Sequence, residues 1–426
     1  MRANPSRPAG MAGKLCVVLL FLLALLGAGP ALAQTAAASA LAAESEYQLI
    51  GEYDLARLDK ILGADLQDFL SSSPVRDEYK KNDVFPPALY PVKLYKVRYA
   101  SVVPELGNRP TIASGLVAVP QSGAMTMPVV SYQHGTVFSK DDVPSRPERS
   151  SETRIMIARF AAQGYVVICA DYFGRGDSDL PDSYLVKEST QQATFDMLQA
   201  AKSVLGRLGV APGQLFISGW SQGGWATMAF LQKLESLKVS VVAAAVASGP
   251  VDVALTLNRW VNNPQPVDAV YLPASVTLLA HAYANYHGVP GFTEFAIRPQ
   301  YVQAAHDLYA GRIDFTAFYA KTTPSLTDFT TPEFRAMVAS ASGAFGASLQ
   351  ADQVYRWRLV TPLRTWYGGA DEVTPEWIGR LPAQVQKLVG GADTQAFDAG
   401  SNADHRGVFL RAVRDQKPWF DSLLTK

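Results

Sequence analysis

Segments whose hydrophobic residues have the spacing of a strand alternate along this chain with segments that have the spacing of a helix. Apolar or alternating runs predict strands at 92–103, 111–119, 127–132, 165–170, 214–218, 239–247, 359–367 and 394–397. Runs with helical spacing predict helices at 55–70, 152–162, 189–208, 225–231, 375–388 and 406–424. The first two strands are joined by the turn residues Gly107-Asn108-Arg109-Pro110, which predict a hairpin. Because later strands are apolar throughout and alternate with helices, we expect an α/β fold with a mostly parallel sheet and helices on both faces.

The alternation stops over 252–357, which follows the sixth predicted strand. This stretch is helical in pattern and rich in Ala, Tyr and Phe. We expect it to be a helical cap inserted into a core formed by 46–251 and 358–426. Such a cap would lie over the carboxyl edge of the sheet, where ligands bind in open α/β folds. The alternative is a separate helical domain with no role at that edge.

The first residues have the three parts of a secretory signal peptide. Its basic residues are Arg2, Arg7 and Lys14. They precede an apolar segment at 15–26 and a small-residue cleavage site, Ala31-Leu32-Ala33. An uncleaved membrane anchor needs about 20 apolar residues, more than this segment has. We therefore expect a signal peptide over 1–33, an unstructured leader over 34–45, and an exported protein, periplasmic or secreted, with no stable membrane anchor after cleavage.

Composition narrows the possible partners. Lys plus Arg and Asp plus Glu each number 38, so no charge excess points to nucleic acid as a partner. The chain has only two cysteines, Cys16 in the signal segment and Cys169 in an apolar predicted strand. The mature protein therefore has no internal disulfide, and we expect Cys169 to be a buried core residue.

Gly219-Trp220-Ser221-Gln222-Gly223 lies between a predicted strand and a predicted helix. A G-x-S-x-G pattern in this context is typical of a nucleophile elbow, a sharp turn that projects the serine oxygen above the sheet. Glycines on both sides leave room for the turn, because a Cβ would collide with the neighbouring strand and helix. Ser221 is therefore the candidate nucleophile.

A serine nucleophile needs a base, and the base needs an orienting group. Of the five histidines, His134 closes a strand, and three lie in the expected cap (His281, His287 and His306). His405 follows the last predicted strand and is the candidate base.

Asp371 follows the preceding predicted strand and is the candidate orienting acid. An alternative role for Asp371 is to cap the next helix, a role for which Glu372 competes. Asp252, after the sixth strand, is the reserve candidate for the acid. The order Ser221, Asp371, His405 is that of the α/β-hydrolases.

The oxyanion of an acyl-transfer reaction needs preset N–H donors. We expect one from Gln222, which follows the nucleophile, and the second from Gly135 or Thr136 in the loop after the third strand. His134 is expected to support this loop by hydrogen bonding. No H-E-x-x-H, paired-cysteine or calcium-loop pattern is present, so we expect neither a metal nor another cofactor.

Two segments add a resemblance to these motifs. Tyr132-Gln133-His134-Gly135-Thr136 and 171–178 (DYFGRGDS) are similar to segments of the secretory lipases, the group of α/β-hydrolases that includes the fungal lipase A type. From about residue 92 onward the chain resembles this superfamily. The resemblance implies a Ser-Asp-His triad and a helical insertion after the sixth strand. Asp182-Ser183-Tyr184 departs from the His-Pro-Tyr expected there, which leaves the substrate open.

These observations predict an exported serine esterase or lipase that acts on a small-molecule or lipid ester through an acyl-enzyme. We expect aromatic residues to line an apolar substrate pocket, namely Trp220, Tyr271, Tyr283, Tyr286, Phe292 and Phe295. A serine peptidase of the aminopeptidase type is the first alternative. It needs cap carboxylates for a substrate ammonium, and the cap offers Asp268, Glu294, Asp307, Asp314 and Asp328. The second alternative is a binding protein without catalysis.

Overall fold

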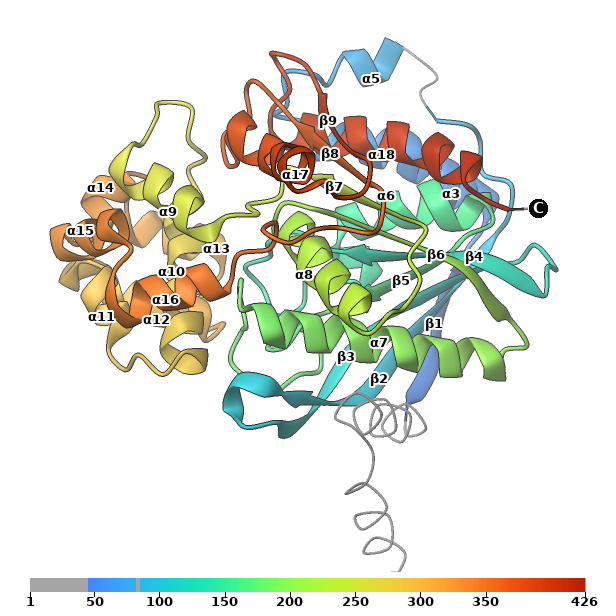
Figure 1. Cartoon of the computed structure of the whole chain (residues 1–426). Helices are drawn as coiled ribbons and strands as arrows, with labels where there is room; N and C mark the ends of the chain where they lie inside the picture. The colour runs from blue at the N-terminus through green and yellow to red at the C-terminus, as the bar shows by residue number, and fades with distance from the viewer. Residues whose placement is uncertain (1–44, 82–84, 426) are drawn as a thin grey trace, which may run out of the picture.

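The computed structural model describes residues 45–81 and 85–425. The predicted signal peptide, and the predicted leader except Ser45, lie outside these residues. A central sheet with helices on its two faces makes up most of the fold, and a group of helices lies beside one end of the sheet (Figure 1). No helix in the described part of the chain is both long and apolar enough to cross a membrane.

The sheet has nine strands in the order β1-β2-β3-β5-β4-β6-β7-β8-β9. They are β1 (Glu46–Tyr53), β2 (Val92–Val103), β3 (Arg109–Pro120), β4 (Thr126–Gln133), β5 (Val166–Ala170), β6 (Ala211–Trp220), β7 (Ala243–Ala247), β8 (Leu363–Tyr367) and β9 (Thr394–Asp398). The pairs among β1, β2, β3 and β5 are antiparallel, whereas β5, β4, β6, β7, β8 and β9 pair in parallel. Both central strands β5 and β7 are buried at every residue, as a sheet covered on two faces requires. The predicted fold class is confirmed.

Helices cover the two faces of the sheet. One face packs against α7 (Lys187–Arg207), α8 (Gln222–Ser236) and α17 (Glu376–Val389), and the other against α6 (Ser151–Phe160) and α18 (His405–Ser422). Each helix turns an apolar side to the sheet, as Trp225, Met228 and Leu231 do on α8. The remaining short elements of the core are α3 (Leu55–Lys60), η2 (Ile61–Asp65), α4 (Leu66–Phe69), α5 (Glu78–Lys81), η3 (Pro104–Leu106), η4 (Pro147–Arg149) and η5 (Ala161–Gln163). The single helix predicted over 55–70 is therefore divided by the π-helical turn η2.

A helical insertion separates β7 from β8. It contains α9 (Val253–Asn262), α10 (Leu272–Tyr286), α11 (Phe292–Ala296), α12 (Pro299–Tyr309), α13 (Phe315–Lys321), α14 (Leu326–Phe329), α15 (Pro332–Ser340) and α16 (Gly343–Ala351). These helices, yellow to orange in Figure 1, gather beside the sheet. Two hydrogen bonds tie the insertion to the loop after β8. Trp260 donates to the carbonyl of Val373 at 2.8 Å, and the N–H of Ala269 donates to the carbonyl of Glu372 at 3.0 Å.

The edge strand β1 was not predicted. It pairs antiparallel with β2, and its register shifts between Leu49 and Gly51. This bulge breaks the period-two alternation, and both Leu49 and Ile50 are exposed. The sequence therefore lacks the pattern of a half-buried strand at this position. Because β1 precedes the predicted strands, the sixth predicted strand is β7, and the insertion follows it as expected.

Candidate active site

Ser221 lies in the turn between β6 and α8. Its φ and ψ of 59° and −127° lie in a region that a non-glycine residue rarely adopts, so the backbone is strained there. The neighbouring glycines permit this turn. A Cβ on Gly223 would lie 1.9 Å from the carbonyl oxygen of Gln133, and one on Gly219 would lie 2.1 Å from the carbonyl oxygen of Gly223. The local sequence thus allows the end of β4 to approach the start of α8 closely.

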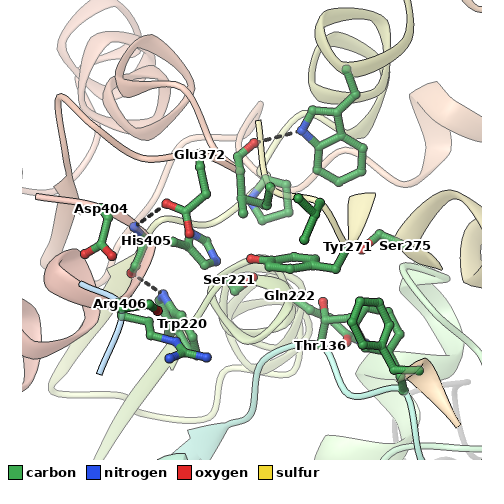
Figure 2. A pocket seen from close by; sticks show the side chains of 18 of the residues that line it. Thr136, Trp220, Ser221, Gln222, Tyr271, Ser275, Glu372, Asp404, His405 and Arg406 are labelled. Atoms are coloured by element: carbon green, nitrogen blue, oxygen red, sulfur yellow. Dashed lines mark hydrogen bonds between the residues drawn. The ribbon is translucent and has the colours of Figure 1, made fainter. Parts of the chain in front are cut away.

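His405 begins α18, directly after the loop that follows β9. Its Nδ1 lies 2.9 Å from Oδ1 of Asp371, and its backbone N–H donates to Glu372 at 2.9 Å. The other ring nitrogen, Nε2, is buried and has no hydrogen-bond partner among the described residues. His405 and Ser221 line the same cavity, and the imidazole lies beside the serine (Figure 2). Nε2 is therefore the ring nitrogen that is free to act as a base.

Asp371 is held by several donors at the end of β8. Its Oδ2 accepts from the Ser248 hydroxyl at 2.6 Å, and its Oδ1 accepts from the N–H groups of Val373 and Thr374. Burial raises the pKa of this carboxyl, but His405 and the hydrogen bonds outweigh burial and lower the pKa below 3.8. Burial likewise lowers the pKa of His405, and the Asp371 carboxylate reverses the effect, so that the pKa lies above 6.5. Asp371 is thus an ionised group that orients His405 and favours its protonated form.

The reserve acid Asp252 lies elsewhere. Its carboxylate caps α9 through the N–H of Leu255 at 3.0 Å and accepts from the Tyr355 hydroxyl and the Arg356 guanidinium. The helix after Asp371 begins with Pro375 at its N-cap, which makes no side-chain capping bond. Asp371 therefore contacts His405 and does not cap the helix that follows it, and Glu372 accepts instead from the first N–H of α18.

Two consecutive peptide groups in the loop after β4 are held by side chains. The carbonyl of His134 accepts from the Tyr172 hydroxyl at 3.1 Å, and the N–H of Gly135 donates to Glu152 at 2.9 Å. Because Glu152 already binds the N–H of Gly135, that group is not available to an oxyanion. The N–H groups of Thr136 and Gln222 have no protein acceptor within 45–81 and 85–425. Of the alternatives Gly135 and Thr136, the geometry leaves Thr136.

His134 makes its contacts within this loop. Its Nδ1 lies 2.8 Å from the carbonyl oxygen of Gly135, its Nε2 lies 3.3 Å from that of Asp171, and its ring stacks on Tyr172. Burial lowers the pKa of His134 to about 4, so the ring is neutral at neutral pH. A neutral imidazole carries one N–H, and the shorter distance assigns it to Nδ1. These contacts are those of a residue that supports the loop.

The cavity above Ser221 has a volume of about 480 Å³. Residues of the core line it together with residues of the insertion: Ser72, Thr136, Phe138, Tyr184, Trp220, Ser221, Gln222, Pro250, Trp260, Ala269, Val270, Tyr271, Ser275, Phe315, Glu372, Val373, Asp404, His405 and Arg406. The hydroxyl of Tyr271 points toward Ser221 and His405 (Figure 2). Tyr184, which was not assigned to the site, also lines the cavity and has its hydroxyl 3.1 Å from that of Thr136. Of the aromatic residues predicted to form the pocket, Trp220 and Tyr271 line this cavity.

The other predicted pocket aromatics pack elsewhere, and their assignment needs correction. Tyr283 donates to Asp352 at 2.7 Å, and Tyr286 donates to the carbonyl of Pro181 at 2.6 Å. Phe292 packs against Phe295, Phe334 and Phe345. All of them belong to the interior of the insertion or to its contact with the core. The prediction was wrong because helical spacing identifies the buried side of a helix but does not show which residues that side contacts.

A second cavity of about 700 Å³ adjoins the first. The two share Thr136, Phe138, Trp220, Phe315 and Arg406 in their walls. The second cavity is more polar, because its remaining lining includes Lys140, Asp141, Asp142, Arg149, Glu152, Arg312 and Asp314. Ser221 therefore lies at one end of a longer depression with an aromatic part and a charged part.

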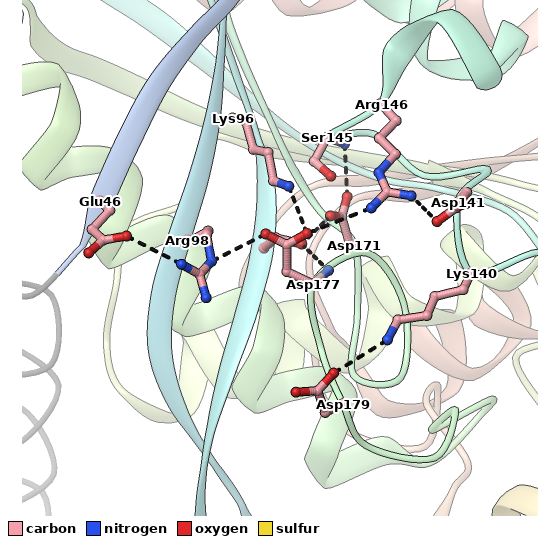
Figure 3. Close-up of polar contacts among 11 residues, drawn as sticks. Glu46, Lys96, Arg98, Lys140, Asp141, Ser145, Arg146, Asp171, Asp177 and Asp179 are labelled. Atoms are coloured by element: carbon pink, nitrogen blue, oxygen red, sulfur yellow. Dashed lines mark hydrogen bonds and ion pairs between the residues drawn. The ribbon is translucent and has the colours of Figure 1, made fainter.

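The segment 171–178 forms the loop after β5 and does not line either cavity. The Asp171 carboxylate accepts from the Ser114 hydroxyl at 2.5 Å and from the N–H of Ser145 at 2.9 Å. Asp177 pairs with Lys96 at 2.7 Å and with Arg98 at 3.2 Å (Figure 3). Within the nearby segment that departs from the His-Pro-Tyr pattern, Asp182 forms a buried ion pair with Arg175 at 2.6 Å. These contacts fix the loop, whose carbonyl at Asp171 faces His134.

Within the described residues, no group of three or more His, Cys, Asp or Glu side chains is placed to hold a metal ion. Cys169 is buried in β5 and forms no disulfide.

The chain is similar to known hydrolases. The sequence model of a family described as "Alpha/beta hydrolase family" matches residues 134–414. One similar solved structure is that of a hydrolase from Legionella pneumophila, with 23% identity over 89% of this chain and 97% of that chain and a TM-score of 0.77. Another is the rice cell wall degrading esterase LipA from Xanthomonas oryzae (21% identity, 88% and 95%, TM-score 0.71). Candida antarctica lipase A is a third (16% identity, 79% and 79%, TM-score 0.62). At these identities the solved structures show a common fold. None of the curated proteins matches the chain.

Proposed function

Since the chain belongs to the alpha/beta hydrolase family, we propose that it is a serine hydrolase that cleaves carboxylic esters through an acyl-enzyme. The observation that carries this proposal is one constellation of three residues. Ser221 is held in a strained turn inside a cavity, the free Nε2 of His405 lies in the same cavity, and the other ring nitrogen is bound to Asp371. This is the relation of nucleophile, base and orienting acid that acyl transfer needs.

The proposed reaction has two halves. Oγ of Ser221 attacks the ester carbonyl carbon while Nε2 of His405 takes its proton, and the N–H groups of Gln222 and Thr136 stabilise the oxyanion. The alcohol leaves with the proton from His405, and an acyl-Ser221 ester remains. Water then attacks this ester with His405 again as the base, which releases the acid and restores Ser221. Asp371 stabilises the imidazolium in both halves, and no cofactor is needed.

The proposed substrate is a small ester with one apolar and one polar part. A cavity of about 480 Å³ is in the range that holds a single small molecule. Aromatic side chains surround Ser221, and charged side chains surround the adjoining depression. An esterase and a lipase among the similar structures agree with ester chemistry. We propose that the insertion acts as a cap, since Val270, Tyr271 and Phe315 form part of the cavity wall.

Acyl-chain length tests this substrate proposal. We expect p-nitrophenyl esters of graded length to give the highest kcat/KM for short or medium chains, because the aromatic cavity is small. The measurement is the rate of p-nitrophenol release for each ester below its critical micelle concentration. A maximum at long chains, reached only in emulsions, would instead indicate a lipase whose cap opens at an interface. Absence of turnover by folded protein would favour the peptidase alternative.

The peptidase alternative has little support in the cap. Among its predicted carboxylates, Asp268 pairs with Arg259 and Asp307 pairs with Arg312. Glu294 contacts His306 at 3.0 Å, and Asp314 caps α13. None of these groups, nor Asp328, lines the cavity with Ser221. A free substrate ammonium thus has no carboxylate cluster from the insertion within this cavity.

Export of the protein is a further part of the proposal, supported by the signal-peptide pattern over 1–33. We expect the full chain, expressed in a bacterial host, to appear outside the cytoplasm with Gln34 as its first residue. N-terminal sequencing of the exported protein checks this. An exported protein that still begins with Met1 would show that the segment is not cleaved.

A further inference from the structure

Glu152 on α6 is a buried carboxylate that the proposed reaction does not use. It is 8% exposed and forms no ion pair among the described residues, although the charge of His405 acts to lower its pKa. Its Oε1 accepts from the Tyr132 hydroxyl and from the N–H of Gly135, and its Oε2 lies 3.2 Å from the same N–H. A buried carboxylate without a cation is costly, and burial raises the pKa of Glu152 to about 7. This energetic cost indicates that Glu152 has a role in holding the loop after β4, to which it is hydrogen-bonded.

The contacts of Glu152 belong to a set that fixes two adjacent peptide planes. In the His134–Gly135 peptide, Tyr172 binds the carbonyl and Glu152 binds the N–H. In the Gly135–Thr136 peptide, His134 binds the carbonyl. Because a trans peptide is planar, its N–H points away from its carbonyl. The one group of these two peptides without a protein partner in the described chain is therefore the N–H of Thr136, and its direction is fixed by the other three.

The same loop is pressed against the elbow. The carbonyl oxygen of Gln133 lies where a Cβ on Gly223 would be, and a Cβ on Gly135 would lie 3.2 Å from both Glu152 and Trp220. Glu152 thus lies beside Gly135, on the side where Gly135 approaches Trp220 of the elbow. A rotation of the His134–Gly135 peptide would break its hydrogen bond to Glu152 and move Thr136.

We propose that Glu152 is a positioning residue that holds the His134–Gly135 peptide and thereby directs the N–H of Thr136 toward the oxyanion of the reaction at Ser221. Glu152 acts through the loop and does not touch the substrate carbonyl. The proposal rests on the proposed function, because it assumes that an oxyanion forms at Ser221. It accounts for a carboxylate that the fold buries without an ion pair.

Two substitutions separate this role from bulk packing. Glu152→Met is close in size and removes both acceptors, whereas Glu152→Gln keeps an amide oxygen that can accept from Tyr132 and Gly135. We expect Glu152→Met to lower kcat by about 10- to 100-fold with KM changed by less than about twofold, since a misplaced donor acts on the transition state. We expect Glu152→Gln to restore kcat to within about threefold of wild type, because one oxygen satisfies the loop.

The matched control is Glu105→Ala. Glu105 is another partly buried carboxyl with a raised pKa, and it accepts from the N–H and hydroxyl of Ser189. It lines neither cavity near Ser221. Its loss removes two hydrogen bonds from the start of α7, and we expect kcat to stay unchanged. If Glu152→Met does not fold, Glu152→Ala is measured instead, because it removes the same two acceptors.

A second readout does not depend on ester turnover. A p-nitrophenyl alkylphosphonate forms a bond from Oγ of Ser221 to phosphorus and releases p-nitrophenolate, and the phosphoryl oxygen occupies the oxyanion position. Mass spectrometry gives the labelling rate, which we expect to fall with kcat in Glu152→Met and to recover in Glu152→Gln. Labelling and kcat at the wild-type level in Glu152→Met would overturn the role of Glu152 and leave the serine hydrolase intact. If wild type is neither labelled nor active, the proposed function itself fails, and if neither removing variant folds, Glu152 is a folding residue only.

Discussion

Replacing Ser221 by alanine is expected to lower kcat for ester hydrolysis by about a million-fold, to the level of background hydrolysis. The Ser221 hydroxyl is the group proposed to form the acyl-enzyme, so the variant loses this intermediate. Substrate binding should persist, because the cavity walls are unchanged. The measurement is p-nitrophenol release by wild type and variant, with a titration of wild-type active sites by phosphonate.

Ser218→Ala is the matched control for this experiment. Ser218 lies three residues earlier on β6, is buried, donates to Gln416 at 2.6 Å and does not line the cavity. Its loss should lower the free energy of unfolding by about 1 kcal/mol and leave kcat within about twofold of wild type. Ser221→Ala relieves no backbone strain, since alanine tolerates a positive φ no better than serine. Ester hydrolysis that survives Ser221→Ala would contradict the assignment of the nucleophile.

Replacing Asp371 by asparagine is expected to lower kcat/KM by about 10⁴-fold. An asparagine amide at this position can donate to Nδ1 of His405, which would favour the tautomer with its proton on Nε2 and leave no base toward Ser221. The pKa of His405 should also fall, because the carboxylate that raises it is gone. Activity requires neutral His405 and therefore rises with pH through this pKa. The rising limb of the profile of kcat/KM against pH should thus move to lower pH in Asp371→Asn.

Asp252→Asn separates the two candidate acids. Asp252 is buried, follows a strand as Asp371 does, and caps α9 in place of contacting His405. Asparagine is also a good helix cap, so kcat/KM should stay within about threefold of wild type. The comparison needs both variants to unfold near the wild-type temperature. A large loss in Asp252→Asn with little loss in Asp371→Asn would reverse the assignment of the acid.

The sequence alone could place the elbow and the base, because each depends on local order. Gly219, Ser221 and Gly223 lie at a predicted boundary between strand and helix, and His405 is the one histidine that follows a strand late in the chain. Asp371 and Asp252 both follow strands, and no local pattern distinguishes them. The choice depends on the distance from His405, which only the folded chain defines.

Local sequence patterns could not predict several other features of the candidate site. Glu152 has the sequence context of an ordinary helix residue, and its contacts come from Tyr132 and Gly135 on another element. The aromatic residues of the insertion share one helical pattern, yet Tyr271 faces Ser221 and Tyr283 faces Asp352. Tyr184 follows a segment that differs from its expected pattern and still reaches the cavity. Long-range packing decides each of these cases.

The helices α9 to α16 supply walls for the cavity but none of the groups proposed to carry the chemistry. These groups come from loops (Thr136, Ser221 and Asp371) or from the first residue of a helix (Gln222 of α8 and His405 of α18) at one edge of the sheet. The groups proposed to react are therefore encoded outside the insertion, whereas the cavity wall is encoded partly in the insertion and partly in the core. Mutations can accumulate in α9 to α16 and change which ester is accepted, while the reacting groups stay in register. Such a division makes the protein readily evolvable, because a new substrate can be acquired without rebuilding the machinery that cleaves it.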